Sequence, residues 1–356
     1  ADIARLFIGG FASSAVFGTV VASVADKYGR RRIALVYAGI YFLSCLTKHS
    51  RRFSVLLAGR VLAGIAASIL FSVFESWLVC EHNSRGFPAA LLADSFSKAQ
   101  FLNSVIAISA GQTAGLAAER FGKTAPFDAA AGVLAVLGIT VAATWTENTG
   151  NARASLGAGF RNAWNALVAS REIVLVGLVQ SCFEGAMYIF VFIWTPVLQD
   201  AHHESGALGE IPHGVIFSTF MVACMIGSSL FWFIEVHLSL TSAMRFIFAL
   251  GTSTFLLAMK SKNVWLTYGA FVVFELICGV YFPAMGTIRA TYVPEENRSA
   301  IMNYFRVPLN VIVVVMLFYE LPLRFVMTLC AALLALATAA QHALHRLSLA
   351  DAKVGT

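Results

Sequence analysis

Arg306 lies inside a long apolar stretch, in the string MNYFRVPLN that runs from Met302 to Asn310. A guanidinium group is a planar fork of N–H donors that suits an oxyanion, and side-chain amides add neutral donors. With steps of 100° along a helix, Asn303, Arg306 and Asn310 lie within about 60° of one another. The spacing predicts one helix face that offers donors to a negative charge.

Pro308 lies in the same stretch. Proline removes the backbone amide that would bond the carbonyl of Tyr304, and it can bend the helix beside Arg306. We expect a hinge for a conformational change at this position. A kink with a purely structural role is the alternative.

Further polar side chains interrupt other apolar stretches, namely Arg60, Glu75, Gln180, Glu184 and Glu275. An unpaired charge deep in a membrane costs about 2.5 kcal/mol or more, so charged residues there are functional candidates. A single amide more often makes an ordinary hydrogen bond between helices. Arg60 is therefore a functional candidate, with a structural pairing to a neighbouring helix as the alternative, and Gln180 is a further candidate for a polar contact.

The three glutamates are predicted to pair with arginines or to carry protons. A rise of 1.5 Å per residue places Glu184 and Glu275 near the middle of their helices. The same count places Glu75 near the cytoplasmic end, at a depth similar to that of Arg306. A Glu75–Arg306 ion pair in the empty protein is therefore geometrically possible.

The composition predicts the elements that carry these residues. The 356-residue chain is 58% hydrophobic and 12% charged, with a mean hydropathy of +0.76, whereas soluble proteins carry about 25% charged residues. Apolar segments long enough to cross about 30 Å of hydrocarbon as helices cover residues 6–25, 33–47, 53–80, 97–118, 125–145, 172–195, 214–236, 241–259, 264–287, 300–321 and 323–341. Because backbone groups in lipid must be satisfied internally, these eleven spans predict an all-α membrane protein.

The longest polar interruption predicts the domain organisation. Residues 146–171 would link an N-terminal lobe at 1–145 to a C-terminal lobe at 172–345, followed by a tail at 346–356. Five spans precede the linker and six follow it, as in a two-lobe bundle of twelve helices whose first helix is missing. No signal-peptide pattern precedes the first apolar run. Lys and Arg are more numerous on the side of the Lys27–Arg32 loop, so that loop, the linker and the tail are expected in the cytoplasm.

Several classes of function do not fit the residue pattern. The net charge of +6 comes from Lys and Arg scattered between apolar runs, so no nucleic-acid partner is expected. The six cysteines have no C-x-x-C spacing, and His202, His203 and His213 have no acidic or Cys constellation beside them, so neither a metal site nor a cofactor is expected. No Ser-His-Asp or Cys-His set converges, which argues against an enzyme. We expect a monomer surrounded by membrane lipids.

The first apolar stretch ends in ASVADKYGRRR, residues 22–32. An Asp at a helix end, a Gly turn and a basic triplet can hold a short loop by charge pairing and so latch one conformation. A simple positive-inside anchor would explain the arginines but not Asp26 and Gly29 at this spacing. The string resembles the loop G-x-x-x-D-[RK]-x-G-R-[RK]-[RK] of the major facilitator superfamily, from which it departs at Ala22. The resemblance implies a latch role for Asp26, Gly29 and Arg30.

A second string, GRVLAGIAAS at residues 59–68, resembles the fourth-helix motif of that superfamily, R-x-x-x-G, through Arg60 and Gly64. Small residues at Gly64 and Ala67 allow two helices to approach closely. The superfamily resemblance implies two related six-helix lobes with the substrate site at their interface.

The closest resemblance is to the molybdate-anion transporter family within this superfamily. It is carried by the strings FSVFESWLVCEH, FGKTAPFDAA, SCFEGAMYIFVFIWTPVL, GVIFSTFMVACMIGSSLF, ICGVYFPAM and NYFRVPLN. The resemblance implies uptake of molybdate, a tetrahedral oxyanion, across the cell membrane. Arg306 with Asn303 and Asn310 is then the first choice for oxyanion contact.

Two other hypotheses remain at this stage. A proton-coupled carrier of another anion or a small organic solute would use Glu184 and Glu275 rather than Arg306. A receptor or scaffold without transport would need its intramembrane polar residues for stability alone.

Overall fold

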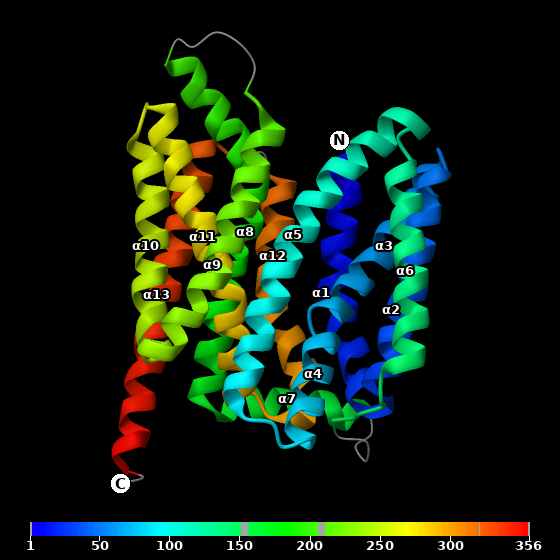
Figure 1. Ribbon diagram of the computed structural model, residues 1–356, viewed down its shortest axis with the longest axis vertical. Coiled ribbons are helices and arrows are strands. Elements are labelled where there is room, and N and C mark those ends of the chain that lie inside the picture. Colours follow the sequence, from blue (N-terminus) through cyan, green and yellow to red (C-terminus); the bar gives the residue numbers. More distant parts are fainter. Residues whose placement is uncertain (1, 151–155, 206–210, 320, 355–356) are drawn as a thin grey trace. The chain divides into compact units, whose positions relative to one another are not determined.

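Long helices make up nearly all of the described chain (Figure 1). The computed structural model describes residues 2–150, 156–205, 211–319 and 321–354. Its α-helices are α1 (Asp2–Tyr28), α2 (Arg30–Leu46), α3 (Phe53–Leu70), α4 (Val73–Ser84), α5 (Ala89–Phe121), α6 (Ala125–Thr144), α7 (Leu156–Ala169), α8 (Arg171–Glu204), α9 (His213–His237), α10 (Leu240–Lys260), α11 (Val264–Tyr292), α12 (Arg298–Phe318) and α13 (Leu323–Val354). Short 3₁₀ turns are η1 (Thr47–His49) and η2 (Glu295–Asn297). The prediction of an all-α membrane protein is confirmed.

Every predicted apolar segment corresponds to one or two of these helices. Among the described residues, nine helical segments are long and apolar enough to cross a membrane, or ten if the bent pair Arg5–Gly18 and Val20–Tyr28 within α1 is one span. The remaining predicted span corresponds to α2, which has 17 residues and so extends only about 26 Å. The predicted count of eleven is therefore approximate.

The structure departs from the sequence prediction at residues 71–72. The predicted span 53–80 assumed one continuous helix, but α3 ends at Leu70 and α4 begins at Val73. Arg60 and Glu75 therefore lie on two separate helices, and the prediction of one continuous helix over 53–80 is wrong.

The interruption at 146–171 contains a helix that the sequence analysis did not predict. This helix, α7, covers Leu156–Ala169. Trp164 on α7 packs edge-on against Tyr304 of α12, with ring centroids 5.6 Å apart. The segment is thus partly helical and packs against a membrane-spanning helix.

The chain divides into two compact units. Unit 1 comprises residues 1–87, 110–173 and 293–319. Here α1 packs against both α3 and α12, while α2 packs against α3 and α6. Close approach of α1 and α3 depends on Gly64, because a Cβ there would collide with the Gly10 carbonyl and the Ser13 hydroxyl.

Unit 2 comprises residues 88–109, 174–292 and 320–356. Within it α10 packs along α13 and α9 along α11. Aromatic rings from α8, α10 and α11 fill its interior, with Phe190, Phe255 and Phe274 in edge-on contact. The predicted lobe boundaries at 145 and 172 differ from those of the two units, and the lobes stay a prediction.

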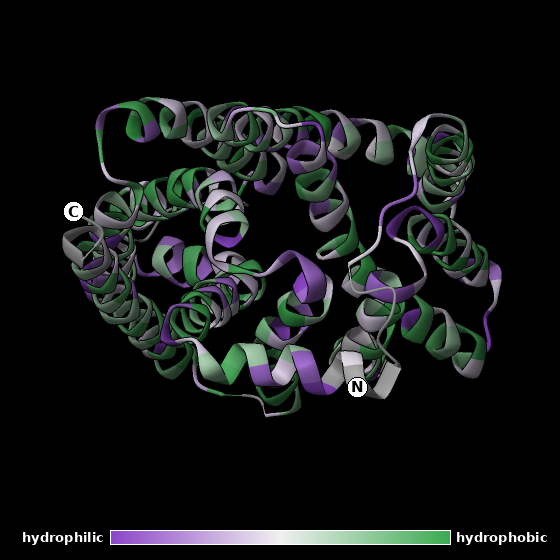
Figure 2. Ribbon diagram, turned by 90° about the horizontal axis from the view of Figure 1, so that it is seen from below, coloured by the Kyte–Doolittle hydropathy of each residue, from purple (hydrophilic) through white to green (hydrophobic). Residues whose placement is uncertain are grey.

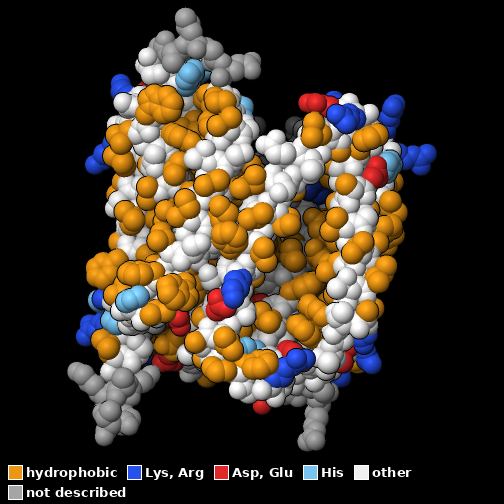
Figure 3. Space-filling view, viewed as in Figure 1, with side chains coloured by type: hydrophobic (Ala, Val, Ile, Leu, Met, Phe, Trp, Pro, Cys, Tyr) orange, Lys and Arg blue, Asp and Glu red, His pale blue; other side chains and the backbone are white. Residues whose placement is uncertain are grey.

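The surface distribution fits helices surrounded by lipid. Figure 3 shows Lys, Arg, Asp and Glu mainly near the helix ends, with hydrophobic side chains between them. Hydropathy colouring along the ribbon gives the same impression, with hydrophilic residues in short stretches (Figure 2). Large apolar side chains such as Ile139 and Phe246 are about 70% exposed, as expected for positions that face hydrocarbon.

Candidate functional site

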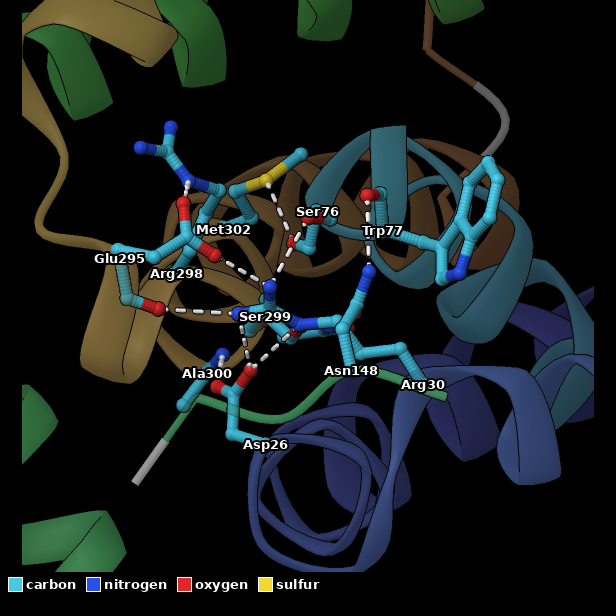
Figure 4. A network of polar contacts seen from close by, with 11 residues as sticks. Asp26, Arg30, Ser76, Trp77, Asn148, Glu295, Arg298, Ser299, Ala300 and Met302 are labelled. Atoms are coloured by element: carbon cyan, nitrogen blue, oxygen red, sulfur yellow. Dashed lines mark hydrogen bonds and ion pairs between the residues drawn. The ribbon is translucent and has the colours of Figure 1, made fainter. Parts of the chain in front are cut away.

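Arg30 is the centre of a buried polar cluster in unit 1 (Figure 4). Its side chain is completely buried. The Nη2 atom lies 3.0 Å from Asp26 Oδ1 and donates to the Glu295 carbonyl at 2.9 Å, while Nη1 bonds the Glu295 carboxylate and donates to the Ser76 carbonyl at 2.9 Å. Burial alone would lower the pKa of Arg30, but the Asp26 and Glu295 carboxylates beside it raise the pKa above the ordinary arginine value.

Asp26 also binds the beginning of α12. The backbone N–H of Ala300 donates to Asp26 Oδ2 at 3.1 Å, so this carboxylate meets one of the unpaired amides of a helix N-terminus. Arg298, almost fully buried, donates from Nε to Glu295 Oε2 at 3.2 Å. The Arg30 cluster (Asp26, Arg30, Glu295 and Arg298) therefore ties α1 and α2 to the first turn of α12.

A segment that follows α6 closes the other side of this cluster. Asn148 accepts a hydrogen bond from the Arg30 backbone N–H at 2.9 Å, and Glu147 accepts one from the Arg31 N–H at 2.9 Å. Gly29, between α1 and α2, has a φ of +117°, and a Cβ on it would collide with the Glu147 carboxylate. Gly29 is thus required by both its backbone conformation and its packing.

The predicted donor face of α12 is present in the structure. Asn303, Arg306 and Asn310 are all buried in unit 1. The Arg306 guanidinium lies over the Phe71 ring, 4.2 Å from its centroid. Asn310 Nδ2 lies 3.3 Å from Ser14 Oγ. The three side chains follow one side of α12, toward the residues of α1 and the end of α3.

Asn310 has an incomplete set of partners. Its Oδ1 atom is buried and accepts no hydrogen bond from the described residues. Ser14, which receives the amide of Asn310, also shares a hydrogen bond of 2.7 Å with Ser68. This corner of unit 1 therefore holds three polar side chains from three helices.

Three other predicted residues lie elsewhere in unit 1. Arg60 on α3 is half-buried and stands over the Phe7 ring at 4.6 Å. Glu75 is in the first turn of α4, where its charge acts on Arg298. Pro308 lies within α12, which continues as a helix to Phe318. The proposed pairing of Glu75 with Arg306 and the hinge role of Pro308 stay predictions.

The remaining predicted residues lie in unit 2. Glu184 on α8 accepts a hydrogen bond of 3.2 Å from Tyr281 Oη on α11. One turn earlier, Gln180 Oε1 accepts one of 3.3 Å from Arg289 Nη1. The predicted span 264–287 ends before Arg289, but α11 extends to Tyr292 and buries this arginine.

Glu275 lies near the middle of α11 and has different neighbours. It is 9% exposed, and it acts electrostatically on Cys224 of α9 and on Cys278 of its own helix. Gln100 Nε2 of α5 lies 3.3 Å from Cys224 Sγ. The described residues place a carboxyl group, two thiols and an amide together at this depth.

Within the described part of the chain, no group of three or more His, Cys, Asp or Glu side chains could hold a metal ion. The six cysteines are free thiols, and five of them are buried. The arrangement offers charge pairing, anion contact and proton binding.

Comparison with known proteins settles the family. The chain is 36% identical, over 325 residues, to the molybdate-anion transporter of Xenopus laevis, and the match covers 87% of this chain and 69% of that protein. A family model for sugar transporters with 12 transmembrane segments matches residues 1–271. The chain belongs to the molybdate-anion transporter family.

Solved structures show the fold of this molybdate-anion transporter family member. The human organic anion transporter MFSD10 matches with a TM-score of 0.72 and 16% identity, over 94% of this chain and 83% of that one. A bacterial homologue of ferroportin in its outward-facing state matches with a TM-score of 0.75 and 13% identity, over 97% and 90%. These likenesses agree with the family model in showing a major facilitator superfamily fold, and the chain is a multi-pass membrane protein.

Several residues of this family member escaped the sequence analysis. Glu295 was overlooked because its partner Arg30 is 265 positions away in the chain, and Arg298 was overlooked because it pairs with Glu295. The string PEEN before the apolar run of α12 was the available signal, since acidic residues favour a helix N-terminus. Glu147 was overlooked because nothing in the sequence relates it to Gly29.

Proposed function

We propose that this chain is a secondary transporter that takes up molybdate across the cell membrane by alternating access. The observation that carries the proposal is the 36% identity to a molybdate-anion transporter over 87% of the chain. The relatives are transporters and not enzymes, and we assign this chain no catalytic role. It acts as a monomer in the lipid bilayer.

Arg306 is the proposed contact for the oxyanion. Its guanidinium lies over the Phe71 ring. This contact orients the planar group through its face, so the contact itself uses none of the N–H donors. Asn303 and Asn310 follow the same side of α12 and add amide donors. Arg60 serves as a second cation.

Gln180 is a proposed further contact, and the structure adds Arg289 to the candidates. The carboxamide oxygen of Gln180 accepts the Arg289 guanidinium, which leaves the amide nitrogen for another acceptor. Arg289 is buried and places a cation beside Gln180. Glu184, one turn from Gln180 and bonded by Tyr281, would help to orient this pair.

The Arg30 cluster is the proposed conformational latch. Release of α12 from Asp26 would free the first turn of the helix that carries Arg306. Pro308, two residues after Arg306 and two before Asn310, provides the bend. Glu75 is positioned to take over a cation of α12 when the substrate is absent, because its charge already acts on Arg298.

The test is molybdate accumulation in cells that express the full-length protein, with excess sulfate as competitor. The variant Arg306→Gln is expected to abolish accumulation while the protein still reaches the cell surface. Arg85→Gln is the matched control, because Arg85 is exposed and paired with Glu81 in the same unit.

A different result favours the second candidate. Uptake that survives Arg306→Gln but is lost in Glu184→Gln would indicate a proton-coupled carrier of another anion or small organic solute. Absence of any solute accumulation by the wild-type protein would contradict transport altogether.

A further inference from the structure

Glu275 is the buried carboxyl group of unit 2 that the anion contacts leave unused. It lies near the middle of α11, at a helix contact where the backbones of α9 and α11 nearly touch: a Cβ on Gly279 would collide with the carbonyl of Cys224. Such close contact excludes bulky or hydrated groups from that side. Glu275 is 9% exposed, so it is buried but not fully enclosed.

No described cation balances the charge of Glu275. The described residues contain no ion pair to its carboxylate and no hydrogen bond that donates to it. The groups close enough to interact with it electrostatically are the thiols of Cys224 and Cys278. Thiols are weak donors and carry no positive charge.

The helices packed around α11 supply no compensating charge at this depth. The interior part of α9 contributes Cys224, and that of α10 between Arg245 and Lys260 has no titratable side chain. In the interior part of α8, between Glu172 and Asp200, the titratable groups are Cys182, Glu184 and Tyr188, and rings of this helix contact those of α11. On α5 the charges of Asp94 and Lys98 pair with each other at 2.7 Å.

The other two intramembrane glutamates differ from Glu275 in their partners. Glu184 accepts a hydrogen bond from Tyr281, and Glu75 interacts with the Arg298 charge. Each of the two thus has a described donor or positive charge that interacts with its carboxyl group. A buried carboxyl group without such groups is stable chiefly when it carries a proton, since an isolated charge is costly in a medium of low dielectric constant.

We propose that Glu275 is the site that carries a proton together with molybdate, an inference that rests on the proposed function. The proton is taken from the outer solution while the anion site is loaded, and it is released to the cytoplasm after the conformational change. One proton offsets one of the two negative charges of the dianion, so the net charge moved falls from −2 to −1. Proton and molybdate then move inward in one cycle, and Glu275 returns without its proton.

The experiment uses the full chain in liposomes that contain a pH-sensitive dye, with the membrane potential held at zero. An inward molybdate gradient should acidify the lumen of wild-type liposomes. Glu275→Gln should abolish this acidification and retain exchange of labelled molybdate for unlabelled molybdate, because exchange needs no net proton movement. The control is Glu235→Gln, since Glu235 is a half-buried residue near the end of α9. This variant should acidify the lumen and exchange molybdate as the wild type does.

The outcomes separate this inference from the proposed function. Exchange by the wild type without acidification overturns proton coupling and leaves molybdate transport standing. Acidification that persists in Glu275→Gln overturns the assignment to Glu275, as does joint loss of exchange and acidification in a variant that remains folded. If Glu275→Gln is misfolded, Glu275→Asp replaces it, and an unchanged pH dependence of uptake in that variant contradicts the assignment. A wild-type chain that exchanges no molybdate overturns the proposed function, and this inference falls with it.

Discussion

Asp26 in unit 1 and Glu275 in unit 2 are both buried carboxyl groups, 5% and 9% exposed, but their surroundings are opposite. Asp26 lies 3.0 Å from the Arg30 guanidinium and accepts the Ala300 N–H at 3.1 Å. Glu275 lies near enough to the thiols of Cys224 and Cys278 to act on them electrostatically, and no cation pairs with it among the described residues. Equal burial therefore conceals two different electrostatic situations.

The difference teaches that partners, rather than depth, decide what a buried acid does. A carboxylate surrounded by donors joins the helices that supply those donors, so its removal leaves other groups unsatisfied. A carboxyl group with few donors contributes little to the fold, which leaves its protonation available for function. Stability measurements on the two sites can test this contrast directly.

The largest effect is expected at Asp26. Asp26→Ala removes one of the two carboxylates that hold Arg30 and leaves the Ala300 amide without its acceptor, so the free energy of unfolding should fall by about 3–5 kcal/mol. The measurement is thermal unfolding of the purified protein in detergent. Replacing both partners, in Asp26→Ala with Arg30→Met, should recover part of the loss because no buried charge is then left uncompensated. A single variant as stable as wild type would contradict the locking role.

A smaller effect is expected at Gly29, which lies between Asp26 and Arg30 in the chain. Gly29→Ala forces a side chain into φ of +117° and against Glu147, at a cost of about 1–3 kcal/mol. The same unfolding assay measures it, with Gly39→Ala as the matched control, since no atom lies within 4 Å of a Cβ at Gly39. Combining Gly29→Ala with Glu147→Ala separates collision from backbone strain, and full recovery in the double variant would show that strain contributes nothing.

The helices of both units could be predicted because hydropathy acts locally. Each apolar run of the sequence became a helix, and Asn303, Arg306 and Asn310 lie on one side of α12 as their spacing predicts. The break at Phe71 and Ser72 could not be predicted in this way, because neither residue is Gly or Pro and the interruption depends on how α3 and α4 pack. Local patterns thus determine the presence of helices better than their continuity.

The partners that are distant in sequence could not be predicted for either acid. Arg30 bonds Glu295, and Asp26 bonds Ala300, across more than 260 residues of sequence. The loop motif indicates that Asp26 is paired, but it does not say that α12 is part of the latch. For Glu275 the sequence gives the depth, whereas the nearness of Cys224 follows only from the contact between α9 and α11.

The smallest effect is expected at Glu275, and it is the sharpest test of the contrast. Glu275→Gln replaces a carboxyl group by a neutral amide of the same shape, so the unfolding free energy should change by no more than about 0.5 kcal/mol. Asp26→Asn, an equally conservative change in unit 1, should be clearly destabilising because the Arg30 guanidinium loses a charged partner. Both variants are measured in the same thermal assay. A loss at Glu275 as large as that at Asp26 would mean that Glu275 is held as an anion in the native protein, and the two buried acids would then serve the same structural purpose.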